Sequence, residues 1–133
     1  MDSPEAGVLA AVEAYVAGVS ANDESLVLSA FRPDAVMWGY LGGQDIVVLP
    51  ATEFARIVAG SPDPAGWVAG YQHRVRSIEV TGDVAVAVLE ENGYLGTADF
   101  TNYFSLVKAD GAWRIAAKAF YLTGGKLPAP PAD

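Results

Sequence analysis

The sequence predicts an α+β domain in which three N-terminal helices pack on a strongly curved, mostly antiparallel sheet. Apolar residues recur at helical spacing in the first third of the chain, whereas residues 71–123 alternate apolar and polar side chains between turn sequences. Helices followed by a run of strands are typical of the α+β class. At 133 residues the chain fits one domain. We expect this domain to span residues 1–123, and a flexible tail rich in Gly and Pro to span residues 124–133.

The first two helices are expected to form a hairpin. Ser3 and Pro4 are typical of an N-cap and a first helical position, and the spacing that follows places Tyr15 on the buried face. Asn22 or Asp23 can cap the second helix. That helix should extend through Phe31 and end before Pro33, because the residue preceding a proline avoids the helical conformation.

Two short strands should follow, around Gly42 and Gly43, and then a third helix that Thr52 caps and Gly60 ends. The longer strands are expected at residues 71–80, 83–92, 97–109 and 112–123.

One irregularity lies in the strand 71–80. Val75, Ile78 and Val80 are apolar, but they fall on one face only if a β-bulge lies near Arg76 and Ser77. Such a bulge would place His73 on the same face.

The composition excludes several kinds of function. The chain has no cysteine, so disulfides and thiolate catalysis are excluded, and its single histidine excludes a site with two His ligands. No phosphate-binding loop or nucleophile motif is present, and we expect neither a metal nor a cofactor. A net charge of −8 disfavours nucleic acid. The acidic N-terminus lacks a secretory signal and no apolar run reaches the roughly 20 residues of a membrane span, so we expect a cytoplasmic protein without a membrane partner.

Asn102 is the most informative candidate site residue. Strand alternation places it on the same face as Phe100, Phe104 and Leu106. A buried amide without partners costs a few kcal/mol, so Asn102 is either paired inside the fold or directed at a bound molecule. We interpret it as a pocket residue, with Phe100 and Phe104 as substrate contacts.

Three further positions are candidates for acid–base chemistry. His73 is the natural general base or acid, because histidine is the residue type whose unperturbed pKa lies near neutrality, although a lone histidine near a strand start is more often a surface residue. Glu90 and Glu91 alternate faces, so an inward glutamate is a second candidate base. The buried Tyr15 hydroxyl either is satisfied within the core or is directed into a pocket.

The last strand and the strand near residue 38 supply further candidate substrate contacts. The small Ala119 leaves room for a ligand beneath Tyr121, or equally for a helix. Trp38 shares a face with Tyr40; such a pair is more often found in a core or dimer interface, and Trp38 is also a candidate contact. One face of the last strand is expected to be apolar and to carry Trp113, Ile115, Ala117, Ala119 and Tyr121.

The segments EAYVAGVSANDESLVLSAFRPDAVMWG, SIEVTGDVAVAVLE and FTNYFSLVKADGAWRIAAKAF resemble the nuclear transport factor 2-like (NTF2-like) superfamily, which includes SnoaL-like and ketosteroid isomerase-like proteins. Within it they are similar to a group of small bacterial proteins named for lumazine binding, a name that is a label and not evidence for that ligand. The resemblance implies a cone-shaped, cystatin-like fold that isomerases, dehydratases, cyclases, hydrolases and non-catalytic subunits share. It also implies a homodimer formed through the open sheet face.

Two members of the superfamily resemble this chain in their pocket residues. In ketosteroid isomerase a helix-1 tyrosine and a protonated acid form an oxyanion hole, and an aspartate moves the proton. Tyr15 and Asn102 match the first two positions, but the base position falls at or beside Gly39, so that mechanism is not supported. Scytalone dehydratase is similar at Tyr15, His73 and Asn102 by position and residue type, although its second histidine has no counterpart.

The predicted function is binding of a small apolar organic molecule in the cone, followed by proton transfer on a carbonyl-bearing substrate without a cofactor. The reaction would be an isomerisation, dehydration or cyclisation. Tyr15 and Asn102 would donate hydrogen bonds to the substrate oxygen, and His73 or an inward glutamate would move the proton. The alternatives are a non-catalytic binding or dimeric assembly module, and a structural dimer whose cone is filled by its own side chains. The sequence leaves open whether the protein is an enzyme.

Overall fold

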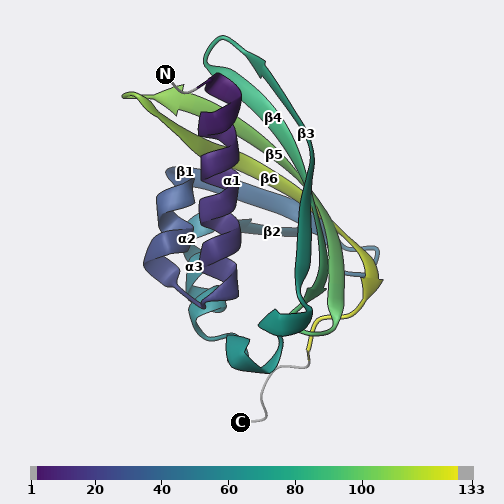
Figure 1. The fold of residues 1–133 in the computed structure, drawn as a ribbon. Coiled ribbons are helices and arrows are strands. Elements are labelled where there is room, and N and C mark those ends of the chain that lie inside the picture. The colour runs from purple at the N-terminus through teal and green to yellow at the C-terminus, as the bar shows by residue number, and fades with distance from the viewer. Residues whose placement is uncertain (1–2, 129–133) are drawn as a thin grey trace.

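The structure is a computed structural model that describes residues 3–128, in which three α-helices pack on a six-stranded sheet. This arrangement confirms the predicted α+β class with a strongly curved sheet (Figure 1). The helices are α1 (Pro4–Ser20), α2 (Glu24–Ala30) and α3 (Ala51–Ala59), followed by the 3-10 turns η1 (Pro64–Gly66) and η2 (Val68–Gly70). The strands are β1 (Phe31–Tyr40), β2 (Val47–Pro50), β3 (Gln72–Thr81), β4 (Val84–Tyr94), β5 (Ala98–Ala109) and β6 (Ala112–Gly125).

The sheet has the strand order β2-β1-β6-β5-β4-β3. Neighbouring strands are antiparallel except β1 and β6, which run parallel. The last strand, β6, lies in the middle of the sheet between β1 and β5. The sheet curves around α1, and α2 and α3 lie beside that helix on the same concave side (Figure 1). The concave face of β4, β5 and β6 therefore faces the helices.

Local capping fixes the first two helices as predicted. The Ser3 hydroxyl accepts a hydrogen bond from the backbone N–H of Ala6, and Asp23 accepts one from Leu26, both at 3.1 Å. These bonds satisfy N–H groups that lack partners within the helix. In the part of the chain that the structure describes, no helix is long and apolar enough to cross a membrane.

Two helix boundaries differ from the prediction. α3 begins directly after Pro50, whose backbone is extended, so Thr52 lies inside the first turn and does not cap the helix. Phe31 was expected to be helical, but it has extended dihedral angles and begins β1. Its burial in the core stabilises this early start of the strand. The predicted end of α3 at Gly60 is confirmed.

The predicted β-bulge in β3 is confirmed. The pairing of β3 with β4 shifts between Val75 and Ser77, and half-buried Val75, Ile78 and Val80 consequently share the concave face. His73 pairs with Glu91 across the two strands and so belongs to this face, but it lies near the strand end and is exposed.

A second bulge, in β6, was not predicted. Ser105 of β5 pairs with Ala117 while Leu106 pairs with Ile115, which leaves Ala116 as the extra residue. Beyond Ala116 the alternation is reversed: Lys118 and Phe120 are buried, whereas Ala119 and Tyr121 are exposed. The expected continuous apolar face from Trp113 to Tyr121 is therefore wrong.

Regular structure extends past residue 123, where the domain was expected to end. β6 continues through Gly125, and the backbone N–H of Lys126 donates to the carbonyl oxygen of Thr97 at 3.0 Å. Leu127 is half-buried and packs against the core. Residues 129–133 of the predicted tail lie outside the described residues.

Candidate functional site

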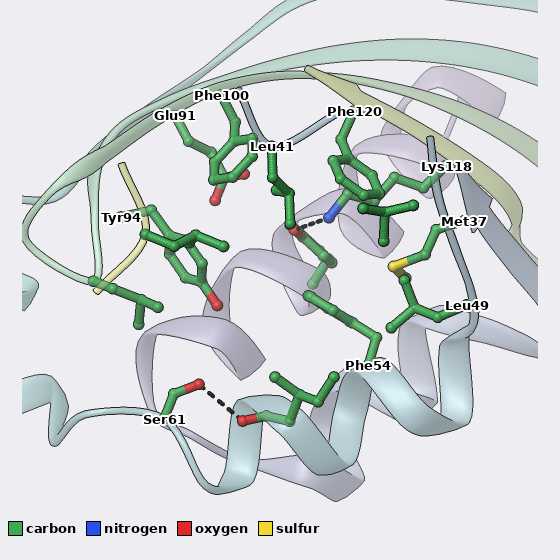
Figure 2. Close-up of a pocket in the computed structure, with 15 residues that line it drawn as sticks. Met37, Leu41, Leu49, Phe54, Ser61, Glu91, Tyr94, Phe100, Lys118 and Phe120 are labelled. Atoms are coloured by element: carbon green, nitrogen blue, oxygen red, sulfur yellow. Dashed lines mark hydrogen bonds between the residues drawn. The ribbon is translucent and has the colours of Figure 1, made fainter. Parts of the chain in front are cut away.

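A cavity of about 200 Å³ lies between the concave face of the sheet and the helices (Figure 2). Five of its lining residues carry polar side-chain atoms: Tyr15, Ser61, Glu91, Tyr94 and Lys118. The rest of the wall is apolar and consists of Met37, Leu41, Val47, Leu49, Phe54, Ile57, Leu95, Phe100, Phe120 and Leu127. An apolar hollow with a few polar groups is the usual form of a small-molecule site.

Glu91 of β4 supplies a carboxyl group to the cavity. Its side chain is buried and points from the sheet into the hollow (Figure 2). Its Oε2 atom accepts a hydrogen bond from the Tyr71 hydroxyl, and its Oε1 atom accepts one from Nδ2 of Asn102, both at 2.6 Å. Burial and then the charge of Glu91 raise the pKa of Tyr71, so the Tyr71 hydroxyl stays protonated and donates. The carboxyl group is thus fixed at both oxygens.

Asn102 of β5 is fully buried behind Glu91 and does not line the cavity. Besides its bond to Glu91, its Nδ2 atom donates a hydrogen bond to the carbonyl oxygen of Leu89 at 3.4 Å. Its Oδ1 atom has no hydrogen-bond partner among the described residues. The amide is therefore paired inside the fold, and its partner is a group of the cavity wall. Asn102 thus contacts the cavity wall through Glu91.

Lys118 of β6 brings an amine to the same cavity from a different strand (Figure 2). It is 5% exposed, and its Nζ atom donates to the Tyr15 hydroxyl at 2.6 Å. Nζ also lies 4.5 Å from the ring centre of Phe54 and 5.4 Å from that of Phe120, close enough for cation–π attraction. Burial lowers the pKa of Lys118 to about 8, although the charge of Glu91 acts in the opposite direction.

Tyr15 is positioned by the buried face of α1. Its ring stacks on Phe54 at 6.1 Å and meets Phe31 and Phe104 edge-on at 6.0 and 5.2 Å. These contacts fix the ring while its hydroxyl stays at the cavity wall beside Lys118. Burial, and to a smaller extent the charge of Glu91, raise the pKa of Tyr15 well above its ordinary value, so its hydroxyl keeps its proton.

The other residues predicted for acid–base chemistry do not converge with Tyr15. His73 stacks on Tyr71 with 5.7 Å between ring centres, and it is exposed in a surface hollow with Arg74 and Asn92. Its pairing with Glu91 places His73 on the concave side of β3, but its side chain is exposed near the start of this edge strand. Tyr15, Asn102 and His73 therefore do not share one cavity.

The predicted substrate contacts fall in three different places. Phe100 lines the cavity, whereas Phe104 is buried in the core against Tyr15. Trp38 and Tyr121 are 47% and 59% exposed and lie with Ala119 in a shallow hollow on the outer face of the sheet. The bulge at Ala116 is the reason that Ala119 and Tyr121 face outward.

Gly39, at or beside the position matched to the isomerase base, lies against Phe120. A Cβ atom at Gly39 would overlap the ring and the carbonyl oxygen of Phe120, its neighbour on β6. The Phe120 ring occupies the space that a base at this position would need.

Sequence reasoning missed Lys118 and the role of Tyr71. The available signal for Lys118 was a lysine between two alanines in an otherwise apolar strand, but regular alternation assigned it to the outer face. Glu91 was recognised only as one of two possible inward glutamates.

A strongly curved sheet that holds helices and an apolar cavity on its concave side defines an NTF2-like domain. The family model described as "putative lumazine-binding" matches residues 3–121, and the chain belongs to this family. No curated protein matches the chain in sequence.

Solved structures agree with this fold. An NTF2-like protein of unknown function from Shewanella baltica superimposes with a TM-score of 0.81 at 18% identity, covering 90% of this chain and 93% of that one. An NTF2-like protein of unknown function from Methylobacillus flagellatus gives 0.75 at 25% identity, covering 89% and 90%. A ketosteroid isomerase-like protein from Erwinia carotovora gives 0.67 at 18% identity, covering 93% and 99%. These likenesses establish the fold.

Proposed function

We propose that the protein binds a small, largely apolar carbonyl compound and moves a proton on the carbon next to the carbonyl group, using only its own side chains. The observation that supports this function is the fixed carboxyl group of Glu91, which points into the same apolar cavity as the Lys118–Tyr15 pair. One group of the cavity can accept a proton and the other two can donate hydrogen bonds.

The volume of the cavity favours a ligand with one ring. An engineered apolar cavity of about 150 Å³ in another protein binds benzene. The cavity here is about 200 Å³, which suits one ring with a short substituent and is small for a fused four-ring skeleton. Its apolar wall favours a ligand body without many polar groups. Lumazine is a polar bicyclic compound, and we expect it to bind more weakly than a one-ring ketone.

Lys118 and Tyr15 are the proposed donors to the carbonyl oxygen. The ammonium group has three N–H donors, of which one is used by Tyr15 in this structure. A donor aimed at an oxygen that gains negative charge stabilises the transition state more than the ground state, typically by a few kcal/mol. The low polarity of the surrounding rings increases that effect.

Glu91 is the proposed general base. Asn102 and Tyr71 hold its two oxygens, which limits rotation of the carboxyl group and leaves further lone pairs for the substrate. Glu91 would take a proton from the α-carbon while the carbonyl oxygen becomes an enolate bound by Lys118 and Tyr15. Return of the proton to another carbon gives isomerisation, and loss of a β-hydroxyl as water gives dehydration.

Hydrogen–deuterium exchange tests this reaction without knowledge of the natural substrate. Cyclohexanone in D₂O would be incubated with the protein, and loss of its α-proton signals followed by NMR. We expect exchange faster than with an equal concentration of free acetate, and saturation as the ketone fills the cavity. A rate equal to that of acetate would contradict catalysis. It would leave the alternative, a binding module in which a ligand raises the melting temperature but is released unchanged.

We also propose that two copies associate through the outer face of the sheet. A row of paired residues crosses that face from β2 to β5: Val48, Trp38, Ala119 and Tyr103. Contiguous exposed apolar surface of this kind marks interaction sites. A second copy is the occupant that suits it, because each chain has a net charge of −8 and this row of residues carries no charge, so it brings two copies together with little added repulsion. The exposed large apolar residues of β1, β2, β4, β5 and β6 are Trp38, Val48, Val84, Val86, Tyr103 and Tyr121.

A further inference from the structure

The chain contains three lysines, Lys108, Lys118 and Lys126, and their surroundings differ. Lys108 and Lys126 are exposed, whereas Lys118 is 5% exposed and ends inside the cavity. Lys118 is therefore the lysine that a molecule bound in the cavity would meet.

The surroundings of Nζ favour a reactive amine. Apart from the Tyr15 hydroxyl, Nζ faces the rings of Tyr15, Phe54 and Phe120, whose centres lie 4.5–5.4 Å away, and rings stabilise an ammonium less than water does. Burial lowers the pKa of Lys118 to about 8. Roughly a tenth of the side chain is then neutral at pH 7, compared with less than a thousandth of an exposed lysine. A neutral amine in an apolar site is the form that attacks a carbonyl carbon.

We propose that Lys118 forms a reversible imine with an aldehyde or ketone that enters the cavity. This inference rests on the proposed function only in that a carbonyl compound occupies the same site. The occupant is inferred to be a neutral carbonyl compound because a carboxylate ligand would place a second negative charge beside buried Glu91.

The proton balance of imine formation can be met by groups of the cavity wall. The lone pair of Nζ forms the C–N bond while one carbonyl bond pair moves to oxygen. A proton passes from the nitrogen to that oxygen through the Tyr15 hydroxyl, which is hydrogen-bonded to Nζ and receives one proton as it gives another, and a carbinolamine results. The C–O bond then breaks and the nitrogen lone pair forms the C=N bond. The second proton of the nitrogen goes to the oxygen, which leaves as water. Glu91 is the carboxyl group in the cavity that can carry this proton. The net change is one carbonyl and one amine converted into one imine and one water.

Reductive trapping tests the proposal directly. The full chain would be incubated at pH 7 with benzaldehyde and sodium cyanoborohydride, which reduces an imine to a stable secondary amine. Intact mass would give the number of benzyl groups, and peptide mapping would locate them. We expect addition at Lys118 at least tenfold faster than at Lys108 or Lys126 in the same molecules. Equal labelling of the three lysines, or slower labelling of Lys118, would overturn the proposal.

Variants separate the site from general protein reactivity. Lys118→Met should lose the fast addition, and Lys108→Arg should retain it; a fast addition that persists in Lys118→Met would contradict the assignment. The wild-type experiment compares Lys118 with Lys108 and Lys126 in the same molecules, so it remains decisive even if Lys118→Met fails to fold.

The cyclohexanone exchange assay distinguishes failure of this inference from failure of the proposed function. Fast exchange without preferential labelling of Lys118 would refute the imine and leave proton transfer in place. Preferential labelling without exchange would support the imine and refute proton transfer by Glu91. Absence of both results would refute both proposals.

Discussion

Asn102 and Glu91 are joined inside the concave face by a hydrogen bond of 2.6 Å from Nδ2 to Oε1. The amide is fully buried, while the carboxyl group lines the cavity. The contact explains why a polar side chain lies among the apolar residues of β5: it fixes the carboxyl group of the neighbouring strand. Asn102 is therefore a core residue paired inside the fold, and one of its partners, Glu91, lines the cavity.

Replacing Asn102 by Leu is predicted to weaken both the fold and the site. Glu91 would keep Tyr71 as a donor but lose the amide, and loss of a buried hydrogen bond to a charged group costs about 1–3 kcal/mol. Urea unfolding should report this loss of stability. The maximal rate of ketone exchange should fall, whereas the ketone concentration at half-saturation should change less. The reason is that Asn102 does not line the cavity and so does not touch the ligand.

Thr101→Val is the matched control for this variant, since Thr101 is the neighbouring residue on the opposite face of β5. We expect it to leave exchange unchanged. An Asn102→Leu protein with wild-type stability and wild-type exchange would show that the hydrogen bond to Glu91 has no positioning role.

The stability of the protein is predicted to depend on pH through Lys118. The pKa of Lys118 is lowered from 10.5 to about 8 on folding. Between these two values the unfolded chain binds more protons than the folded one, so stability rises with pH in this window. Below the folded-state value, the buried ammonium costs about 3 kcal/mol relative to an exposed one.

Comparison of the wild type with Lys118→Met isolates this contribution, because the other titrating groups are the same in both proteins and their effects on the unfolding free energy largely cancel in the difference. From about pH 7 to pH 10, the unfolding free energy of the wild type should rise relative to that of Lys118→Met by about 2–3 kcal/mol. Urea unfolding at several pH values measures the difference. A difference that stays constant with pH would mean that Lys118 keeps an ordinary pKa in the fold.

The outer face of the sheet is predicted to hold two copies together. Tyr121→Glu places a charge on this face, where Tyr121 is 59% exposed, and should convert dimers into monomers in light scattering. Leu28→Glu on α2 is the control, because Leu28 is also an exposed apolar residue but lies on a helix. A wild-type protein that is monomeric at all concentrations would refute the proposed dimer.

The fold was predictable because its signals are local and regular. Ser3 and Asp23 cap their helices as expected, and the odd spacing of Val75 and Ile78 revealed the bulge in β3. In that strand the apolar side chains contrast with charged neighbours, so a change of alternation is visible in the sequence.

The bulge in β6 had no such signal. Ala116 lies between Ile115 and Ala117, and alanine is compatible with either face of a sheet, so regular alternation fits the sequence as well as the true arrangement. The reversal that turns Lys118 inward is decided by pairing with β5 and β1, which are distant in the sequence.

The choice between Glu90 and Glu91 also depended on long-range pairing. The two residues are chemically identical neighbours, and only the register of β4 against β3 and β5 places Glu91 inside and Glu90 outside. Glu90 instead pairs with Arg74 at 2.9 Å and Arg76 at 3.4 Å. The same pairing places His73 at the exposed edge of the sheet, which its residue type did not indicate.

This pair of glutamates offers the most direct test of proton transfer in the cavity. Glu91→Gln removes the base but keeps the size of the side chain, whereas Glu90→Gln makes the same change on the opposite face of β4. The measurement is the α-hydrogen exchange rate of cyclohexanone in D₂O, followed by NMR for both variants. We predict that Glu91→Gln lowers the protein-catalysed rate by at least about one hundredfold, as expected for loss of a general base, and that Glu90→Gln leaves it unchanged. Equal exchange rates in the two variants would contradict the assignment of Glu91 as the base.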